Sequence, residues 1–194
     1  MRKKNKITGA DALLLMLYLD NQSSIDGAIR LTKMMFLFDK EIVPFLNKNG
    51  LDIENLPEFF AYNYGPFSKD VYEQLDLFSS IKFIKIDNLK STDKLMEVDD
   101  LQEPSFINET YESDSIAELD DDGKYYRYKI EKLGKEFVEK NIIDNISPCN
   151  CELLTQFKKK INNLPPKAIL KYVYTNYPDS AKNSIIKDEV LGNE

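Results

Sequence analysis

The chain has 194 residues, of which 42% are hydrophobic, and it carries a formal net charge of −7 with no histidine. That length and apolar content are sufficient for one domain with a buried core. The absence of histidine excludes Ser-His-Asp and Cys-His nucleophiles and histidine-bound zinc, so catalysis by this chain alone would need carboxylates, lysine or tyrosine.

The first 60 residues are predicted to be mainly helical. Apolar side chains recur at spacings of three and four residues over 10–22, which is typical of a helix. A second helix is predicted over 27–42, with Asp26 placed as its N-cap residue. Pro44 begins or kinks the next short helix, and the NKNG sequence at 47–50 ends it.

The second of these helices is almost entirely apolar. Between positions 28 and 38, only Arg30, Thr32 and Lys33 are not apolar residues. A helix that is hydrophobic around most of its circumference is typically buried, so we expect this segment to be a core helix.

An aromatic segment and a capped helix follow. The sequence EFFAYNYGPF at 58–67 is predicted to be extended and to turn at Gly65–Pro66, because proline disfavours the helical conformation of the residue before it. Ser68 is well placed to cap a helix that begins at Lys69. One face of that helix is expected to pack against the core, because it carries three apolar residues at i, i+4 and i+7, namely Val71, Leu75 and Phe78.

Two strands and three more helices complete the predicted elements. Alternating side chains over 81–87 indicate a half-exposed strand, and 124–130 supplies a second strand that can pair with it as a β-ribbon. Helices are predicted over 131–142, 152–164 and 165–177, the last with proline at its start.

The order of these elements defines the expected fold. Helices, then a two-stranded β-ribbon, then further helices is the order of a winged-helix-like core with additions. We therefore predict a single domain over 1–194 that is α+β, mainly α. Its parts are a winged-helix-like helical core, a two-stranded β-ribbon and additional C-terminal helices.

The segment between the two predicted strands is strongly acidic. Residues 95–123 contain eleven carboxylates and no lysine or arginine. Such a stretch is most often a solvated loop. It could instead be a flexible strip that steers toward a basic surface of a partner and covers it. The candidate interaction residues in this insert are Asp99, Asp100, Glu103, Asp120, Asp121 and Asp122.

Three stretches of the sequence together resemble a known family. They are IRLTKMMFLFDKE at 29–41, YNYGPFSKDVYEQLDLF at 62–78 and ILKYVYTNYPDSAKNSII at 169–186. The chain resembles YwgA-like proteins and the SocA-like antitoxin domain, also called Panacea, of bacteria, archaea and phages. The resemblance covers most of the chain but not about 89–123. The chain differs from the family at Tyr62 and Tyr64, since members of the family often have tryptophan near the Gly-Pro turn.

This resemblance implies a mainly helical, winged-helix-like fold without catalytic machinery. In the better understood relatives it implies a protein that neutralises or regulates another protein by binding it, in toxin–antitoxin, defence and phage settings.

The aromatic Gly-Pro segment supplies the candidate partner-binding residues, which are Tyr62, Tyr64, Gly65, Pro66, Phe67, Ser68 and Tyr72. Two interpretations of this cluster are open. It could fix the angle at which the following helix leaves the turn. Part of it could also line a surface groove and anchor a partner, since tyrosine supplies a large contact area at a small entropic cost.

The charge pattern argues against nucleic-acid binding. A winged-helix protein that reads DNA needs lysine or arginine on its recognition helix and wing. The helix over 69–78 has one lysine against Asp70, Glu73 and Asp76, and the tip of the ribbon is the most acidic part of the chain. The lysines at 158–160 are interpreted as a solvated helix end.

The remaining features concern location and cofactors. No apolar run of about 18 residues is present and residues 1–20 have no A-x-A cleavage site, so we expect a cytoplasmic protein without a membrane association. Cys149 and Cys151 are interpreted as bystander thiols in a polar loop, because a disulfide at this spacing is strained. We expect no metal and no cofactor.

The sequence therefore predicts a non-catalytic regulator that binds a protein partner and is antitoxin-like or associated with phage defence. One alternative is a DNA-binding winged-helix transcriptional regulator. Another is an accessory subunit of a larger enzyme assembly. Formation of a homo-oligomer is left open.

Overall fold

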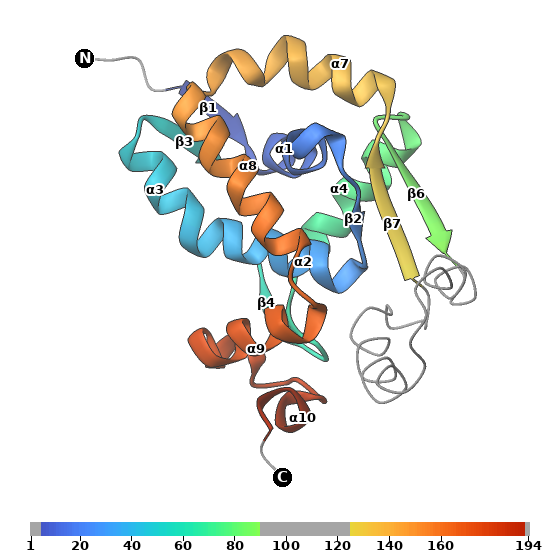
Figure 1. Ribbon diagram of the computed structural model, residues 1–194, viewed down its shortest axis with the longest axis vertical. Coiled ribbons are helices and arrows are strands. Elements are labelled where there is room, and N and C mark those ends of the chain that lie inside the picture. Colours follow the sequence, from blue (N-terminus) through green and yellow to red (C-terminus); the bar gives the residue numbers. More distant parts are fainter. Residues whose placement is uncertain (1–4, 90–124, 193–194) are drawn as a thin grey trace, which may run out of the picture.

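The computed structural model describes residues 5–89 and 125–192, and Figure 1 draws the remainder as a thin trace. The predicted acidic insert over 95–123 lies outside the described residues. The same is true of its candidate interaction residues, Asp99, Asp100, Glu103, Asp120, Asp121 and Asp122.

The centre of the molecule has winged-helix topology. In chain order, its elements are α1 (Gly9–Gln22), β2 (Ile25–Asp26), α2 (Ala28–Leu37), α4 (Lys69–Ser80), β6 (Ile84–Leu89) and β7 (Tyr125–Ile130). The three strands form an antiparallel sheet in the order β2-β7-β6. In this arrangement α4 takes the position of the recognition helix and β6–β7 the position of the wing. The predicted fold class is confirmed, and β2 adds a third strand to the predicted ribbon.

Helix α1 is the core element around which the others pack. A capping box formed by Thr8 and Asp11 begins the helix, and every side chain from Leu13 to Leu17 is buried. Figure 1 shows α1 near the centre, where it packs against α4, α7, α8 and β7. A helix buried on all sides is hydrophobic around its whole circumference, as this one is.

The predicted cap of α2 is wrong. The N-cap residue of α2 is Gly27, which has a φ of 92° and makes no side-chain cap hydrogen bond. Asp26 instead belongs to β2, where its two carboxylate oxygens accept hydrogen bonds of 2.9 and 2.8 Å from Arg127 on β7. Asp26 therefore fastens β2 to the ribbon.

The chain between α2 and α4 forms an insertion in the winged-helix core. Its elements are η1 (Phe38–Ile42, a π-helix), α3 (Val43–Lys48), β3 (Leu51–Glu54), β4 (Phe60–Tyr62) and β5 (Gly65–Phe67). Strand β3 pairs in parallel with β1 (Asn5–Thr8), a contact that was not predicted. Strands β4 and β5 form a hairpin. Figure 1 places this hairpin between α2 and α9.

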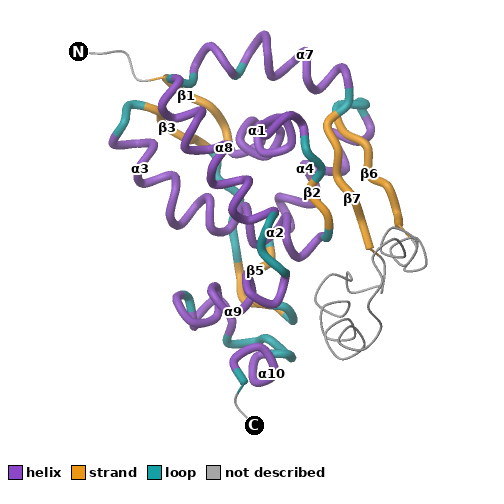
Figure 2. Tube along the Cα trace, viewed as in Figure 1, coloured by secondary structure: helices purple, strands orange, loops and turns teal. Residues whose placement is uncertain are grey.

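The C-terminal part is helical, as predicted. Its elements are α7 (Lys132–Asn141), η2 (Ile143–Asn145), α8 (Pro148–Asn162), α9 (Pro166–Asn176), η3 (Pro178–Ala181) and α10 (Lys187–Leu191). Cys149 and Cys151 are free thiols in the first turn of α8, so their predicted position in a polar loop is wrong. Figure 2 shows helix over most of the described trace, with strands confined to short segments. Within 5–89 and 125–192, none of the helices is both long and apolar enough to cross a membrane.

Candidate functional site

The β4–β5 hairpin carries most of the predicted site residues. Its turn lies at residues 63–64, so the predicted turn at Gly65–Pro66 is wrong. Pro66 lies in β5 opposite Ala61. Proline is tolerated in a two-stranded ribbon because an edge strand does not need every backbone N–H for the ladder.

Gly65 fixes the hairpin against α9. Its φ of +83° belongs to the left-handed region that favours glycine, and a Cβ at this position would lie 2.6 Å from Cε1 of Tyr174. Tyr174 is buried on α9, and its hydroxyl group lies 2.8 Å from the hydroxyl of Ser184. The hairpin backbone therefore packs directly on an aromatic ring, which only glycine allows.

Lys33 joins the hairpin to α2 from the other side. Only 3% of this residue is exposed, and its Nζ donates a hydrogen bond of 2.9 Å to the main-chain oxygen of Pro66. The sequence did not single out Lys33 as a site residue. Its signal was a lysine on a helix that is otherwise almost entirely apolar.

Ser68 begins α4, as predicted. The hydroxyl oxygen of Ser68 accepts a hydrogen bond of 3.4 Å from the backbone N–H of Val71, and Ser68 itself is fully buried. The predicted packing face of α4 is confirmed, since Val71, Leu75 and Phe78 are buried. The role of Ser68 in the structure is thus to set the start of the helix.

Four aromatic rings form a cluster on the outer side of the hairpin. The ring centroid of Phe67 lies 5.5 Å from that of Phe60, 5.3 Å from that of Tyr62 and 5.1 Å from that of Tyr72. Two members of the cluster remain open to solvent, because Phe60 is 49% exposed and Tyr62 is 39% exposed. The cluster therefore orients α4 through Tyr72 and also presents aromatic surface.

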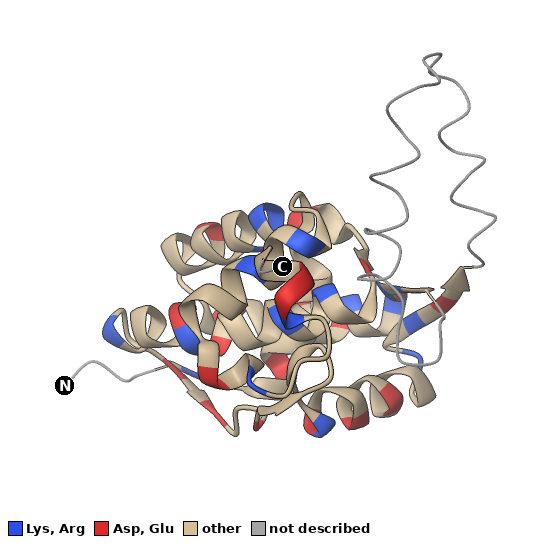
Figure 3. Cartoon of the chain, turned by 90° about the horizontal axis from the view of Figure 1, so that it is seen from below, with Lys and Arg blue, Asp and Glu red and all other residues tan. Residues whose placement is uncertain are grey.

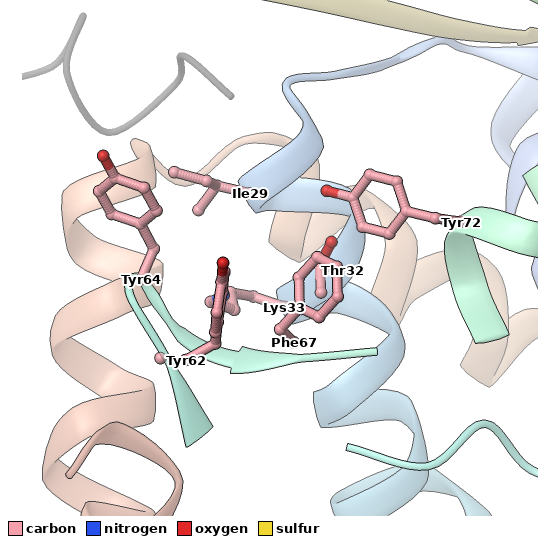
Figure 4. Close-up of a pocket in the computed structure, with 8 residues that line it drawn as sticks. Ile29, Thr32, Lys33, Tyr62, Tyr64, Phe67 and Tyr72 are labelled. Carbon is pink, nitrogen blue, oxygen red and sulfur yellow. The ribbon is translucent and has the colours of Figure 1, made fainter. Parts of the chain in front are cut away.

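A small pocket opens beside this aromatic cluster (Figure 4). The pocket is bounded by α2, the hairpin and α4, and its volume is about 20 Å³, which is room for little more than a water molecule. Its lining residues are Ile29, Thr32, Lys33, Tyr62, Tyr64, Gly65, Phe67 and Tyr72. Five of the seven predicted residues thus meet at one pocket. Pro66 and Ser68 are buried and support it through Lys33 and α4.

The exposed face of α4 is acidic, as the sequence indicated. Lys69 forms an ion pair of 3.0 Å with Glu73, one turn further along the helix. The carboxylate of Asp70 accepts a hydrogen bond of 2.8 Å from the backbone N–H of Glu58, and Asp76 is exposed. Figure 3 shows lysine and arginine scattered among aspartate and glutamate rather than gathered over one element. The exposed face of α4 therefore offers little positive charge to bind the phosphates of a nucleic acid.

A second buried lysine is not among the residues that line the pocket. Lys158 on α8 was predicted to lie at a solvated helix end, and that interpretation is wrong, because the residue is 0% exposed. Its Nζ donates hydrogen bonds of 2.7 Å to the main-chain oxygens of both Leu19 and Ser23. Burial lowers the pKa of Lys158 to about 8, and the nearby charge of Asp20 opposes this shift.

The described part of the chain contains no group of three or more histidine, cysteine, aspartate or glutamate side chains that could hold a metal ion. In comparisons with known proteins, the chain matches no family model and no curated protein. The resemblance to the Panacea domain therefore stays a prediction that rests on the sequence stretches themselves.

Proposed function

We propose that this protein is a non-catalytic regulator that acts by binding another protein, in the manner of an antitoxin or a phage-defence factor. The observation that carries the proposal is the exposed aromatic cluster beside the pocket, made of Phe60, Tyr62, Phe67 and Tyr72. The antitoxin-like character is supported by the resemblance of the sequence to the Panacea domain.

The exposure of the cluster supports a binding role. Phe60 and Tyr62 keep 49% and 39% of their surface exposed although both contact Phe67. Aromatic residues are enriched at protein interfaces, where a few of them contribute most of the binding free energy. An aromatic surface whose backbone is held rigidly on two helices loses little conformational entropy when a partner binds.

The main chain of the hairpin favours recognition through side chains. On the β5 side, Pro66 O accepts the hydrogen bond from Lys33. On the β4 side, the side chain of Asn183 donates to Ala61 O and the backbone N–H of Ile185 donates to Asn63 O. Because both edges are engaged within the molecule, addition of a partner strand would have to break these contacts.

A pair of matched variants tests the proposal. Phe60 in the cluster and Phe45 on α3 are 49% and 47% exposed, so replacement of either by serine should leave the fold intact. We expect the partner to co-purify from the native cell with the unchanged protein and with Phe45→Ser. We expect its recovery to fall at least about tenfold with Phe60→Ser, as for loss of an interface hot spot. Equal recovery with both variants would contradict a role for the cluster.

The functional consequence separates the proposed regulator from an accessory subunit. A neutralising regulator should suppress the activity or toxicity of its co-purified partner. An accessory subunit should raise that activity instead.

A DNA-binding regulator remains the second candidate because the core has winged-helix topology. An electrophoretic shift on genomic DNA, with an affinity that falls steeply as salt increases, would support it. We expect no such shift, because the exposed face of α4 carries Asp70, Glu73 and Asp76 against one lysine.

A further inference from the structure

We propose that two copies of this chain associate through the free edge of β6, which pairs in antiparallel fashion with the same strand of the second copy. This inference goes beyond the proposed function, because β6 shares no residue with the aromatic cluster. It assigns a second surface of the molecule and commits that surface to one partner.

Strand β6 is the longest strand that lies at the edge of a sheet within the described residues. It spans six residues, whereas β2, at the opposite edge of the same sheet, has two. Its register against β7 is continuous from Ile84 to Leu89, and the strand contains no proline. An edge of this kind presents a row of main-chain donors and acceptors to which a further strand can be added.

The hydrogen bonds of the sheet identify the residues of β6 whose main chain faces outward. The backbone N–H of Gly27 donates a hydrogen bond of 2.7 Å to Tyr126 O, so this carbonyl group of β7 faces β2. Asn88 lies opposite Tyr126, so these two residues form a pair without ladder hydrogen bonds. The alternation of an antiparallel ladder then directs the N–H and C=O groups of Ile84, Ile86 and Asn88 away from β7.

The charges of the strand are complementary to those of a second copy. Lys85 and Asp87 project from the same face of β6, where Nζ of Lys85 lies 2.6 Å from a carboxylate oxygen of Asp87. With Ile86 opposite the Ile86 of the second copy, each Lys85 lies opposite the Asp87 of the other copy. In the same register the outward-facing main-chain groups of Ile84 and Asn88 meet those of the second copy. Opposite charges directly across a ladder favour the pairing, whereas like charges there oppose it.

Exposed apolar side chains near the start of the strand add contact area. Leu77 on α4 is 55% exposed, and Ile81, which ends this helix three residues before Ile84, is 42% exposed. Helix α4 packs against β6. A six-residue strand alone buries less surface than a stable dimer needs, so this apolar surface supports the association. We expect a dimer of modest affinity.

Charge reversal tests the proposed pairing. The full chain is studied by sedimentation velocity from about 5 to about 300 µM, and we expect its sedimentation coefficient to rise from that of a monomer toward that of a dimer. Lys85→Asp would bring carboxylates opposite each other in the dimer, and Asp87→Lys would bring ammonium groups opposite each other. We expect either variant alone to dimerise at least about tenfold more weakly than the unchanged protein.

A mixture of these two variants separates an effect between chains from an effect within one chain. Each variant loses the ion pair between positions 85 and 87 of its own strand, but the mixture restores opposite charges across the interface. We therefore expect the equimolar mixture to dimerise at concentrations where neither variant does so alone. A mixture that associates no better than its separate components would overturn the proposal, as would an unchanged chain that stays monomeric at about 300 µM.

A proline variant supplies an independent test. Because the N–H of Asn88 faces the free edge, Asn88→Pro should keep the hydrogen bonds between β6 and β7. We expect Asn88→Pro to block dimerisation and Asn88→Ala to retain it, with the same far-UV circular dichroism for both variants. Equal dimerisation of the two variants would contradict an interface at this edge. If Asn88→Pro does not fold, the mixture of charge variants still decides the question.

Discussion

Lys33 and Lys158 place the same side-chain chemistry in two different regions. Both are buried in helices, and both donate hydrogen bonds to main-chain oxygens at 2.7 to 2.9 Å. Lys158 lies within the packing of α1 and α8, whereas Lys33 lies under a pocket walled by aromatic rings. The difference teaches that a buried lysine by itself indicates no function, because the same side chain can hold the end of a helix in one region and a hairpin in the other.

The region around Lys158 has a structural explanation. Helix α1 ends irregularly, because Asp20 and Asn21 have φ values of 55° and 52°. The last carbonyl groups of a helix have no partner within the helix. Lys158 satisfies one of them at Leu19, and Lys159 forms an ion pair of 3.4 Å with Asp20. Helix α8 therefore holds the end of α1 in place.

The largest predicted effect is at Lys158. Lys158→Ala leaves the buried carbonyl of Leu19 and the part-buried carbonyl of Ser23 without their donor and opens a cavity, so we expect a loss of about 4 kcal/mol in the free energy of unfolding. Lys33→Ala should cost about 2 kcal/mol, because water that enters from the pocket can replace the donor to Pro66 O. Urea unfolding of both variants measures the difference. A loss at Lys33 as large as that at Lys158 would remove the contrast between the two regions.

The next largest predicted effect is on the free energy of unfolding and concerns the hairpin that lines the pocket. Gly65→Ala combines a left-handed φ with a contact of 2.6 Å to Tyr174, so we expect a loss of about 3 kcal/mol in unfolding free energy. Gly50 is the matched control, because its φ is +81° and a Cβ added there would have no atom within 4 Å. Gly50→Ala should cost only about 1 kcal/mol. Equal losses of unfolding free energy in the two variants, measured by thermal or urea unfolding, would mean that the ring of Tyr174 moves to accommodate the new methyl group.

The smallest predicted effect is a dependence of stability on pH. The pKa of Lys158 is lowered from 10.5 to about 8 in the folded protein, so from pH 8 upward the unfolded chain binds more protons than the folded one. Stability should therefore rise by about 2 kcal/mol between pH 8 and pH 10. Lys158→Met should lack this rise, and Lys33→Met should retain it.

The rise should end above about pH 10. Burial raises the pKa of Tyr174 to about 12, so this tyrosine stays protonated in the folded protein at a pH where the unfolded chain has lost the proton. Its contribution to stability is complete below about pH 10 and is lost as the pH rises toward 12. Urea unfolding across this range should show a maximum, and Tyr174→Phe should weaken the fall. A flat profile would contradict both assignments.

The sequence predicted those features that local patterns determine. The cap at Ser68, the buried face of α4 and the two strands of the ribbon follow from residue types at fixed spacings. The predicted first strand began three residues too early. Residues 81–83 instead close α4, with the backbone N–H of Phe83 bonded to Phe78 O. The clustering of Tyr62, Tyr64 and Phe67 was also predictable, since they share one short segment.

The two buried lysines could not be predicted in the same way. Lysine is normally an exposed residue, and its burial here depends on acceptors that lie 33 residues away for Lys33 and 139 residues away for Lys158. The turn of the hairpin was misplaced for a related reason. Proline usually marks a turn, but here the packing of Gly65 on Tyr174 and the bond from Lys33 hold Pro66 in a strand.

The strand register of the ribbon determines where the connection between β6 and β7 can be altered. Leu89, the last described residue of β6, lies opposite Tyr125, the first residue of β7, at the end of a continuous antiparallel ladder. The described ends of β6 and β7 therefore lie at neighbouring points. Joining ends that are already adjacent requires only a short turn, and the entropy of closing a longer connection grows slowly with its length. The end of this ladder is therefore a place where the connection between β6 and β7 can be shortened or replaced while the described elements keep their arrangement.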